Sequence, residues 1–540
     1  MTDVPRIVHN DWSSLAVAEI GQWEPGPTVS VVIPAYNCQD SLDLTLASLA
    51  RQTYPDDLLE VVVVDDGSSP PVALPQLRPA RCTLVGPANG DAGWGPGHAV
   101  DLGVRHSSGE VILRVDADMV VVPEHVEAHA RWHAAVPYAV SLGRKRFVDV
   151  APGEPGWPTP LEVQKGVVER LFEGYATEPH DYVEKIIRRT DQLRAGDHLT
   201  FLAHVGATVA VRRELYDAAG GVDAALRTGE DTELGYRLAQ AGAVFMPEPL
   251  AAGWHLGRSN VMRDESGLQR YTRTYLADLM PQPRWLRKAG GSAWSVPLVE
   301  AVMDVRGRSL ELVRAAVDAI LRGRESDLRV SLVADWAAIG SERTPVLADA
   351  QLDLRLIEAT YRSDPRVRLV GRAPTNAFPA PYLITVPANA GLAETAIARI
   401  IEEADRHRAG LVRVPLAGDS GAAVELWRTA ALGRAGWVRR EGEAVSEVVA
   451  QLYGVRTLSA DAVRVVDLSA YSADQLAGGI APAGGRGSRW PPASVEVAGL
   501  RSWARATALV ASLSAARIWH VIGRAGQRSA HRRGGVQRGR

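Results

Sequence analysis

Two aspartates directly follow a short apolar stretch: residues 111–115 lead into Asp116-Ala117-Asp118. An apolar run of this length predicts a strand buried in a parallel sheet. In open α/β sheets ligands bind beyond the carboxyl ends of the strands, so these two carboxylates lie where a site is expected. Hard divalent cations take carboxylate oxygens. The alternative is a solvated loop that happens to carry two aspartates, because an Asp-x-Asp triplet alone has little specificity.

A second acidic loop follows an earlier pair of predicted strands. Residues 29–34 predict a strand closed by proline, with a helix capped by Asp40 or Ser41 after it, and residues 60–64 predict the next strand. That strand ends in Asp-Asp-Gly-Ser at 65–68. A right-handed crossover places this loop on the same sheet edge as the first one. A carboxylate there can accept a base N–H or a ribose hydroxyl, whereas an ordinary Asp-Gly turn is the alternative.

Composition limits the class of protein. A chain of 540 residues predicts two or three domains, and 46% hydrophobic with 23% charged residues is typical of a globular chain. A formal net charge of -3 gives no electrostatic reason to expect nucleic acid. The two cysteines, Cys38 and Cys82, favour a reduced compartment over a disulfide framework. Acidic residues in the first 27 positions argue against a secretory signal, and no long apolar stretch predicts a spanning helix, so we expect a cytoplasmic protein.

Three motifs, taken in order, resemble the inverting family 2 glycosyltransferases. The resemblance implies the type A glycosyltransferase fold, a nucleotide-binding α/β sheet. A nucleotidyltransferase, the rival enzyme class on such folds, would carry a Gly-rich basic phosphate loop after the first strand, which is missing here. The motifs are Val-Val-Ile-Pro-Ala-Tyr-Asn at 31–37, Val-Val-Asp-Asp-Gly-Ser at 63–68 and Asp-Ala-Asp at 116–118.

The resemblance also implies roles for individual residues. Asp65 or Asp66 would contact the nucleotide base, and Asp116 would contact the ribose. Asp118 would bind a divalent metal, Mn²⁺ or Mg²⁺, on the donor diphosphate. The full set of expected donor-binding residues is Pro34, Tyr36, Asn37, Asp65, Asp66, His98, Asp116 and Ala117.

The helix predicted from Ala99 to about His106 departs from the family pattern. The family usually has Ala-Arg-Asn-x-Gly here, but Val100 and Asp101 replace the arginine and the asparagine. The phosphate contacts of this helix are therefore in doubt. His98 is the candidate that could supply a polar contact, and an ordinary surface histidine is the alternative.

A later segment, Gly-Glu-Asp-Thr-Glu-Leu at 229–234, resembles the acidic helix start of inverting type A enzymes. At the N-terminus of a helix the dipole favours negative charge and keeps a carboxylate ionised. An ionised carboxylate beside an acceptor hydroxyl is a general base. By resemblance Asp231 takes that role and Glu230 orients the acceptor, whereas capping of the helix predicted at 232–241 is the alternative.

His255 is the further metal candidate. A strand is predicted at 243–246, and a Pro-Glu-Pro connection then leads to Gly-Trp-His at 253–255. In several type A transferases a histidine at this relative place completes the metal shell. A packed histidine is the alternative.

Residues 144–200 form a long insertion rich in aromatic and charged residues, where the family builds acceptor-binding loops. Its first residues, Arg144, Lys145 and Arg146, would face either an anionic acceptor or solvent, and solvent is the favoured interpretation.

The second half of the chain repeats the apolar pattern of the first half but loses the carboxylates expected to bind the metal. Strands are predicted at 297–305, 328–333 and 382–386, and helices at 310–321 and 392–407. Pro-Ala-Asn at 387–389 stands where Asp-Ala-Asp stood in the first half. We therefore interpret residues 1–288 as the catalytic domain and residues 296–470 as a degenerate, non-catalytic copy of the same fold.

The end of the chain changes in composition. Residues 471–496 predict a Gly/Pro-rich linker, and residues 497–540 predict a basic amphipathic helix and tail with nine arginines and no acidic residue. Such a segment is typical of peripheral contact with an anionic membrane surface, and a solvated basic tail is the alternative.

Together these features favour an inverting, metal-dependent glycosyltransferase. Its expected donor is a nucleotide-diphosphate sugar such as a UDP-sugar, and its expected acceptor is a cell-envelope saccharide or a lipid-linked molecule. A non-catalytic saccharide- or nucleotide-binding protein on the same fold and a two-site polysaccharide polymerase are the alternatives. No nucleic-acid partner is expected, and the oligomeric state stays open.

Overall fold

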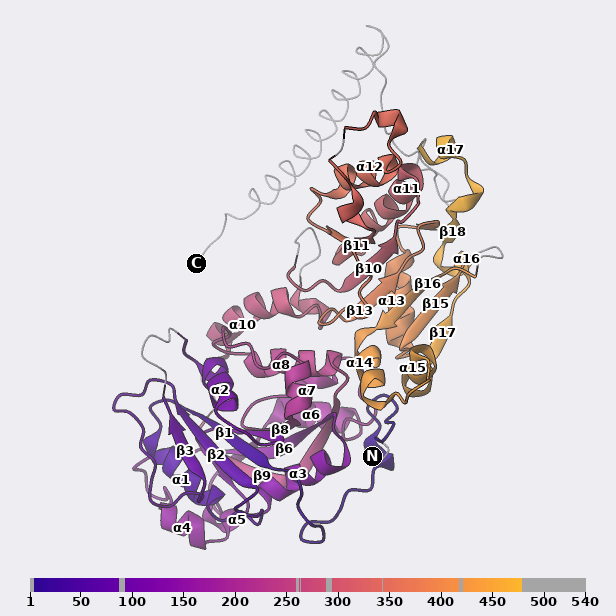
Figure 1. Cartoon of the computed structure of the whole chain (residues 1–540). Helices are drawn as coiled ribbons and strands as arrows, with labels where there is room; N and C mark the ends of the chain where they lie inside the picture. The colour runs from indigo at the N-terminus through magenta and orange to yellow at the C-terminus, as the bar shows by residue number, and fades with distance from the viewer. Residues whose placement is uncertain are drawn as a thin grey trace, which may run out of the picture. The chain divides into compact units, whose positions relative to one another are not determined.

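The computed structural model describes residues 4–86, 93–258, 262, 264–287, 294–341, 343–416 and 421–477 (Figure 1). Residues up to Tyr471 form one compact unit, which contains two large sheets, and a second unit begins at Ser472. The predicted basic tail at 497–540 and most of the predicted linker at 471–496 lie outside the described residues. Within the described residues, no helix is both long and apolar enough to cross a membrane.

The first sheet belongs to an α/β fold, as predicted, but it mixes parallel and antiparallel strands instead of being purely parallel. Its strands follow the order β3-β2-β1-β4-β8-β6-β9-β5, and β7 pairs with the edge of β6. The strands β1, β2, β3 and β4 are parallel, whereas β8 runs antiparallel to both β4 and β6. The bounds are β1 (Val29–Ala35), β2 (Leu59–Asp65), β3 (Cys82–Val85), β4 (Val111–Val115), β5 (Met119–Val121), β6 (Ala139–Val148), β7 (Thr177–Pro179), β8 (Thr208–Arg212) and β9 (Val244–Leu256).

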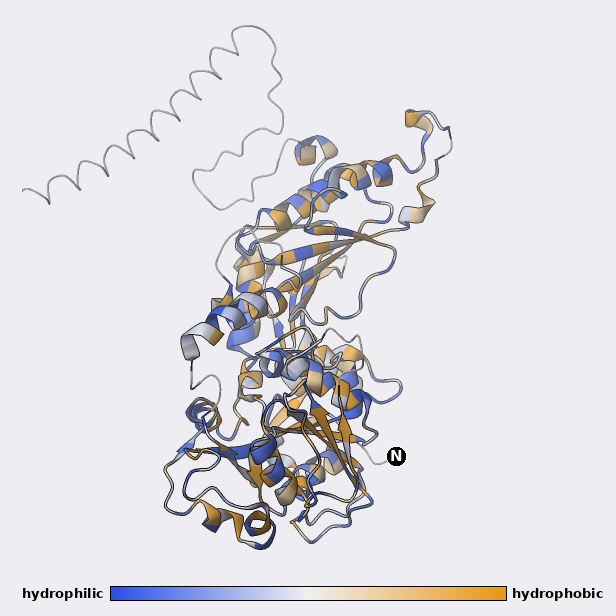
Figure 2. Ribbon diagram, turned by 90° about the vertical axis from the view of Figure 1, so that its left-hand side faces the viewer, coloured by the Kyte–Doolittle hydropathy of each residue, from blue (hydrophilic) through white to orange (hydrophobic). Residues whose placement is uncertain are grey.

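The central strands of this sheet are apolar on both faces because helices cover both sides. Figure 2 shows hydrophobic residues concentrated on these strands. The residues of β1 from Val29 to Ile33 are all buried, as the mostly apolar run predicts, and the polar Ser30 is buried with them. The helices of this half are α1 (Gln39–Leu49), α2 (Pro96–Arg105), α3 (His125–Ala135), α4 (Pro160–Lys165), α5 (Val168–Leu171), α6 (Asp181–Arg189), α7 (Arg213–Ala218), α8 (Glu230–Gln240) and α10 (Glu265–Leu279), with η1 (Trp12–Ser14), η2 (Thr200–Ala203) and η3 (Arg284–Leu286).

Three predicted helix starts are wrong by a few residues. Helix α1 is preceded by Cys38 without a side-chain cap, and the Ser41 hydroxyl instead donates to the Cys38 carbonyl. Helix α2 starts at Pro96 instead of Ala99, because proline suits the first turn of a helix. Helix α8 starts at Glu230, not at residue 232, since Gly229 adopts a left-handed φ of 81° just before it.

The strand predicted at 243–246 is also longer than expected. Strand β9 continues through the Pro-Glu-Pro segment and pairs in parallel with β6 along its whole length. A register shift makes this possible: Gly143 pairs with Glu248, but Arg144 pairs with Ala252. The extra residues bulge out of the sheet there, so the prolines do not interrupt the ladder. His255 therefore lies within a strand and not in the loop after one.

The second sheet has the order β12-β11-β10-β13-β16-β15-β17, and β14 pairs separately with β18. Strand β10 pairs in parallel with β11 and β13, as β1 does with β2 and β4. Strand β16 runs antiparallel to β13, as β8 does to β4. The bounds are β10 (Val299–Asp304), β11 (Leu328–Val333), β12 (Val367–Val370), β13 (Tyr382–Thr385), β14 (Ala390–Leu392), β15 (Leu411–Pro415), β16 (Ala423–Arg428), β17 (Val455–Thr457) and β18 (Val465–Asp467).

This shared strand order supports the predicted second copy, although common ancestry of the two halves stays a prediction. The helix predicted at 310–321 has those bounds. The helix predicted at 392–407 starts later, because Leu392 ends β14. The helices of this half are α11 (Leu310–Leu321), α12 (Leu352–Tyr361), α13 (Ala396–Arg406), α14 (Thr429–Val438), α15 (Val445–Tyr453), α16 (Ala460–Val463) and α17 (Ala473–Ala477), with η4 (Trp336–Ala338), η5 (Val346–Ala348) and η6 (Leu468–Ala470).

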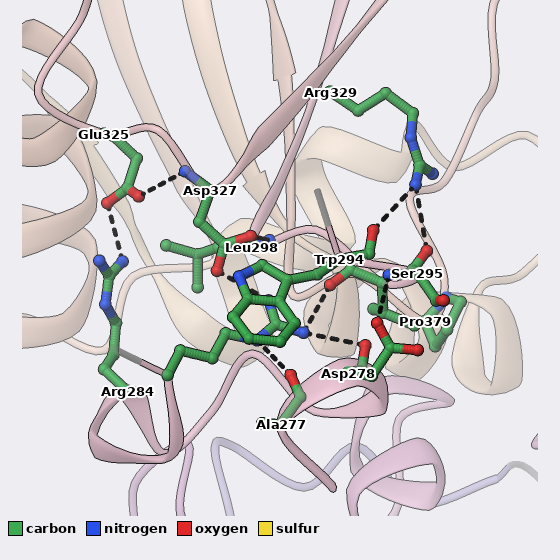
Figure 3. Close-up of polar contacts among 12 residues, drawn as sticks. Ala277, Asp278, Arg284, Trp294, Ser295, Leu298, Glu325, Asp327, Arg329 and Pro379 are labelled. Carbon is green, nitrogen blue, oxygen red and sulfur yellow. Dashed lines mark hydrogen bonds and ion pairs between the residues drawn. The ribbon is translucent and has the colours of Figure 1, made fainter. Parts of the chain in front are cut away.

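A buried arginine joins α10 to the second sheet. The Arg287 guanidinium donates to Asp327 Oδ2 at 2.7 Å and to the carbonyl oxygens of Ala277 and Val296 at 2.6 and 2.7 Å. Figure 3 shows the polar contacts around Asp327, including the ion pair of Arg284 with Glu325 at 2.8 Å. These bonds hold the segment after α10 against β10 and β11.

Candidate active site

Asp116, Asp118 and His255 come together at the end of β4. One ligand atom from each residue lies within 4.8 Å of the other two. Strands β5 and β9 produce this arrangement, because their pairing sets Met119 opposite His255. His255 Nε2 lies 3.3 Å from Asp118 Oδ1, and the ring packs on Phe147 with centroids 4.9 Å apart.

This cluster fits a divalent cation. Asp118 Oδ1 is buried without a hydrogen-bond partner among the described residues. Burial raises the pKa of Asp118, the nearby His255 opposes that rise, and Asp116 adds to it. A cation bound by these side chains would remove the cost of burying the carboxylate. Oxygen and imidazole nitrogen are also the donor types that Mn²⁺ and Mg²⁺ sites use.

Arg114 connects this cluster to the acidic start of α8. Its Nε donates to Asp116 Oδ1 at 3.1 Å, and its Nη1 donates to Glu230 Oε1 at 2.9 Å. Burial raises the pKa of Asp116, but Arg114, His255 and Lys145 outweigh it and hold that pKa below its usual range. Asp116 is thus kept ionised by its neighbours.

Glu230 is buried beneath this arginine. It is 3% exposed, and burial raises its pKa although the Arg114 guanidinium opposes the rise. The sequence analysis did not select Arg114. The signal that would have found it is a charged residue inside an otherwise apolar buried strand, because such a charge needs a partner.

Asp231 lies one residue further along α8 and is held by backbone amides. Its Oδ2 accepts a hydrogen bond from the Gly206 N–H at 2.7 Å, and its Oδ1 accepts one from the Thr232 N–H at 2.6 Å. His204 contributes to the same region, since its Nδ1 lies 2.7 Å from the Asp231 carbonyl oxygen. Burial lowers the pKa of His204 to about 4, so its ring is neutral near pH 7.

Lys145 does not face solvent, so the favoured interpretation from sequence is wrong for this residue. It is on β6, and its Nζ donates to the Gly206 carbonyl oxygen at 2.5 Å. Burial lowers the pKa of Lys145 to about 8, although Asp116 and Asp231 oppose that shift. Arg144 is half exposed near Glu184, and Arg146 donates to Thr177. Strand alternation separates Lys145 from its two neighbours, and the insertion in fact begins within β6.

A cavity of about 310 Å³ adjoins Lys145, between β6 and α6. His180 lies on its wall, and burial, followed by the charge of Lys145, lowers the pKa of His180 to about 3. The Nδ1 of this histidine is buried without a hydrogen-bond partner among the described residues. The cavity wall therefore offers two polar groups, the Lys145 amine and the His180 ring.

The two aspartates after β2 differ in what they bind. Asp65 accepts hydrogen bonds from the N–H groups of Ser68 and Val72 at 2.8 and 3.2 Å, so both of its oxygens serve its own loop. Asp66 Oδ2 accepts one from the Gly95 N–H at 2.7 Å, and Asp66 Oδ1 lies 3.8 Å from His98 Nδ1. Burial raises the pKa of Asp66. Of the two, Asp66 is therefore better placed for a ligand contact.

The other predicted donor residues mainly shape the loops. Asn37 has a φ of 48° and joins two loops: its N–H donates to Ser68 Oγ and its Oδ1 accepts from the Ser69 N–H, both at 2.8 Å. Tyr36 is 62% exposed beside it. Pro34 pairs with Val64 within the sheet. Ala117 is buried, and its carbonyl oxygen accepts a hydrogen bond from Thr45.

A mixed α/β sheet, acidic strand exits, a carboxylate–histidine cluster and an acidic helix start together are the features expected of a glycosyltransferase with the type A fold. Residues 30–216 match the family described as Glycosyl transferase family 2, and the chain contains a glycosyltransferase domain of this family.

Relatives with known names share this similarity. Chondroitin synthase of Escherichia coli is 24% identical over 368 residues, which cover 64% of this chain and 50% of that protein. The undecaprenyl-phosphate 4-deoxy-4-formamido-L-arabinose transferase of Klebsiella pneumoniae (strain 342) is 28% identical over 205 residues, or 36% of this chain and 52% of that protein. The chain thus spans about half the length of each of these two relatives.

Solved structures with similar folds include a mannosyltransferase from Pyrobaculum calidifontis in complex with GDP-Man and Mn²⁺. It is 19% identical with a TM-score of 0.31, and the match covers 52% of this chain and 70% of that one. S. aureus TarS 1–349 in complex with UDP-GlcNAc is 16% identical with a TM-score of 0.33, and covers 46% of this chain and 66% of that one.

Proposed function

We propose that this protein is an inverting, metal-dependent glycosyltransferase. It transfers a sugar from a nucleotide-diphosphate donor, a UDP-sugar, to a hydroxyl group of a cell-envelope saccharide or a lipid-linked acceptor. The observation that carries the proposal is the proximity of a candidate metal cluster at Asp116, Asp118 and His255 to the acidic helix start, with Arg114 bridging the two.

Each side of this site has a separate chemical task. A divalent cation held by Asp118 and His255 would offset the charge that develops on the departing diphosphate. Asp231, at the N-terminus of α8, accepts the proton of the acceptor hydroxyl. The hydroxyl oxygen then bonds to the anomeric carbon as the bond to the diphosphate breaks on the opposite face. This in-line geometry inverts the anomeric configuration.

The remaining residues orient the reactants. Arg114 holds Glu230 and Asp116 at fixed positions through its two hydrogen bonds. The cavity lined by Lys145 and His180 provides space for an acceptor. A cationic amine there favours an acceptor that carries negative charge, such as a phosphate-linked molecule.

The names of the relatives support the choice of acceptor. One relative is a chondroitin synthase and another acts on undecaprenyl phosphate, according to their names. The first concerns a polysaccharide and the second a lipid-linked carrier. Both acceptor classes therefore belong in the test.

The test measures sugar transfer and donor hydrolysis by the full chain, with a panel of nucleotide sugars, with and without Mn²⁺. We expect Mn²⁺-dependent turnover of a UDP-sugar, and we expect Asp231→Asn to lower turnover by about 100-fold or more while donor affinity stays nearly unchanged. The matched control is Asp217→Asn, on the exposed side of α7.

Two results would contradict this proposal. Donor binding without any turnover would instead favour a non-catalytic nucleotide- or saccharide-binding protein. Loss of donor affinity in Asp231→Asn, with turnover of the bound donor preserved, would show that Asp231 has another role.

We also propose, from the sequence alone, that the basic segment 497–540 contacts an anionic membrane surface. Each basic residue near such a surface contributes about 1 kcal/mol, and salt weakens the attraction. Sedimentation with anionic liposomes should pellet the full chain at low salt but not at high salt. Equal pelleting by neutral liposomes, or by a chain that lacks residues 497–540, would contradict the proposal.

A further inference from the structure

A separate cavity of about 70 Å³ lies within the unit that ends at Tyr471. Its walls come from both halves of that unit. The first half contributes the end of α8 and η2, and the second half contributes the start of α14 and the end of α15. None of the residues assigned above to the candidate active site lies on these walls.

Two glutamines on the cavity wall have unmet hydrogen-bonding groups. Gln282 is 1% exposed, and both its Nε2 and its Oε1 are without a hydrogen-bond partner among the described residues. Gln240 is 3% exposed, and its Oε1 is likewise unpartnered within that part of the chain. A buried amide without a partner costs roughly 1–3 kcal/mol, so three such groups on one wall indicate a polar occupant.

Arginines line the same cavity. Arg434 is 1% exposed and donates to backbone carbonyl oxygens, among them those of Ile7 at 3.1 Å and Ala243 at 2.7 Å. Arg408 donates from Nη1 to the carbonyl oxygens of Ala195 and Gly196. Carbonyl groups satisfy the hydrogen bonds of a guanidinium but do not neutralise its charge.

The charge balance of the walls is positive. Arg428, the third arginine, is paired with Asp405 at 2.9 Å, and Asp197 is the acidic residue on the cavity wall itself. Burial, followed by the charges of Arg408, Arg428 and Arg434, lowers the pKa of His9 on the same wall to about 4. Water could satisfy the two amides, but it would not offset the guanidinium charge.

We propose that this cavity binds a small anion that carries a carboxylate or phosphate group. The guanidinium groups of Arg408 and Arg434 face its charge, and Gln282 Nε2 donates a hydrogen bond to it. The Oε1 atoms of Gln240 and Gln282 accept hydrogen bonds from a hydroxyl group that the same anion carries. Amide and guanidinium donors are the groups that proteins use to bind such oxyanions.

The cavity lies at one end of the helix that carries the predicted base. Gln240 is the last residue of α8, and Glu230 and Asp231 are its first two. Just past this end, Gly433 of α14 packs so closely that a Cβ on it would lie 2.7 Å from the Ala241 carbonyl carbon. An occupant of the cavity therefore contacts both halves of the unit. Its binding does not depend on the proposed transferase activity.

The experiment is thermal unfolding of the full chain with EDTA present, titrated with inorganic phosphate, with citrate and with chloride at matched ionic strength. We expect a saturable rise in Tm with phosphate or citrate and none with chloride, because a ligand that binds only the folded state stabilises it. The oxyanion that raises the Tm at the lower concentration shows whether the ligand carries a phosphate or a carboxylate group.

Three variants locate the effect. Gln282→Leu should raise the Tm of the anion-free chain, because it removes an unpartnered buried amide, and should weaken the anion response by at least about 10-fold in concentration. Arg408→Gln should weaken that response similarly. Arg406→Ala is the matched control, since Arg406 pairs with Glu402 and Glu403 on the surface of α13 and does not line the cavity.

Two outcomes would overturn the proposal. If neither oxyanion raises the Tm beyond the chloride control, the cavity holds water alone. If the response is unchanged in both Gln282→Leu and Arg408→Gln, the anion binds elsewhere on the chain.

Discussion

In the candidate site, Arg114 joins two carboxylates that are distant from each other in the sequence. Asp116 lies two positions away, whereas Glu230 lies on α8. Desolvation lowers the pKa of Arg114, but Asp116, Glu230 and Asp231 more than offset this effect and raise it, so the guanidinium is always charged. Removing one charged residue from this buried group leaves the remaining charges without an ion-pair partner.

Arg114→Met should therefore destabilise the fold by about 3–5 kcal/mol in urea unfolding, because it leaves Glu230 buried and unpaired. The double variant Arg114→Met with Glu230→Gln should recover part of this loss. Arg105→Met is the control: its pair with Asp101 on α2 is exposed and should contribute less than about 1 kcal/mol. Equal losses in the single and the double variant would show that Glu230 does not depend on Arg114.

Asp118 permits a second test at this scale. Asp118→Asn should abolish Mn²⁺-dependent binding of UDP without unfolding the protein, because an amide lacks the charge that a hard cation requires. Isothermal titration with and without Mn²⁺ measures this, and Asp56→Asn, at an exposed position, is the control. Unchanged Mn²⁺-dependent binding in Asp118→Asn would contradict the metal assignment.

At the scale of elements, α3 carries a chain of buried histidines four residues apart. Thr208 Oγ1 lies 2.9 Å from His125 Nε2 and 3.0 Å from His129 Nε2. Ser141 Oγ lies 2.7 Å from His129 Nδ1 and 3.0 Å from His133 Nε2. These bonds tie α3 to β6 and β8, directly behind the candidate site.

The three buried histidines on α3 must be neutral in the folded protein. Burial lowers the pKa of His125 to about 4 and that of His133 to about 3, and it lowers the pKa of His129 well below its usual value. In the unfolded chain the same groups take up protons near pH 6.5. The contribution of these neutral histidines to the free energy of unfolding is therefore complete above pH 6.5 and is lost as the pH falls from 6.5 toward 4.

Urea unfolding between pH 7.5 and pH 5 should show this loss, at up to about 1.4 kcal/mol per histidine for each pH unit below 6.5. The variant His133→Leu leaves the hydrogen bond between Ser141 and His129 in place. It should reduce the slope of the free energy of unfolding against pH by the equivalent of about one proton. His407→Leu, on a partly exposed histidine after α13, should leave the slope nearly unchanged. Identical slopes for wild type and His133→Leu would contradict a neutral His133.

At the scale of the whole molecule, the two sheets share a strand order, but the exit of β13 lacks the carboxylates that follow β4. Strand β13 is followed by Pro387-Ala388-Asn389, and the Asn389 amide donates to Asp467 at 2.8 Å. This amide is thus occupied within its own half. A second binding site for a nucleotide-sugar donor at this position would lack the negative charge needed to bind a cation.

Titration of the full chain with UDP and Mn²⁺ should therefore give one binding site per chain. Asp118→Asn should leave no metal-dependent site. A stoichiometry of two in the wild type, with one site retained in Asp118→Asn, would make the protein a two-site polymerase and would end the interpretation of the second half as non-catalytic.

Much of the fold could be predicted because it depends on local sequence. The buried strands β1, β2, β4, β10 and β11 are mostly apolar, with one or two polar residues each, and such segments form strands wherever both faces are covered. Helix starts were less predictable, since Cys38, Pro96 and Gly229 act through backbone geometry rather than through side-chain capping.

The sequence by itself determined where acidic groups leave the sheet, because Asp65, Asp66, Asp116 and Asp118 follow apolar runs directly. Only the tertiary structure decided which of them serve a loop and which face a site. Asp65 is bound by its own turn, and Lys145 is buried although its two neighbours are charged. The physical reason is that burial and ion pairing are set by contacts between distant segments, which neither composition nor periodicity encodes.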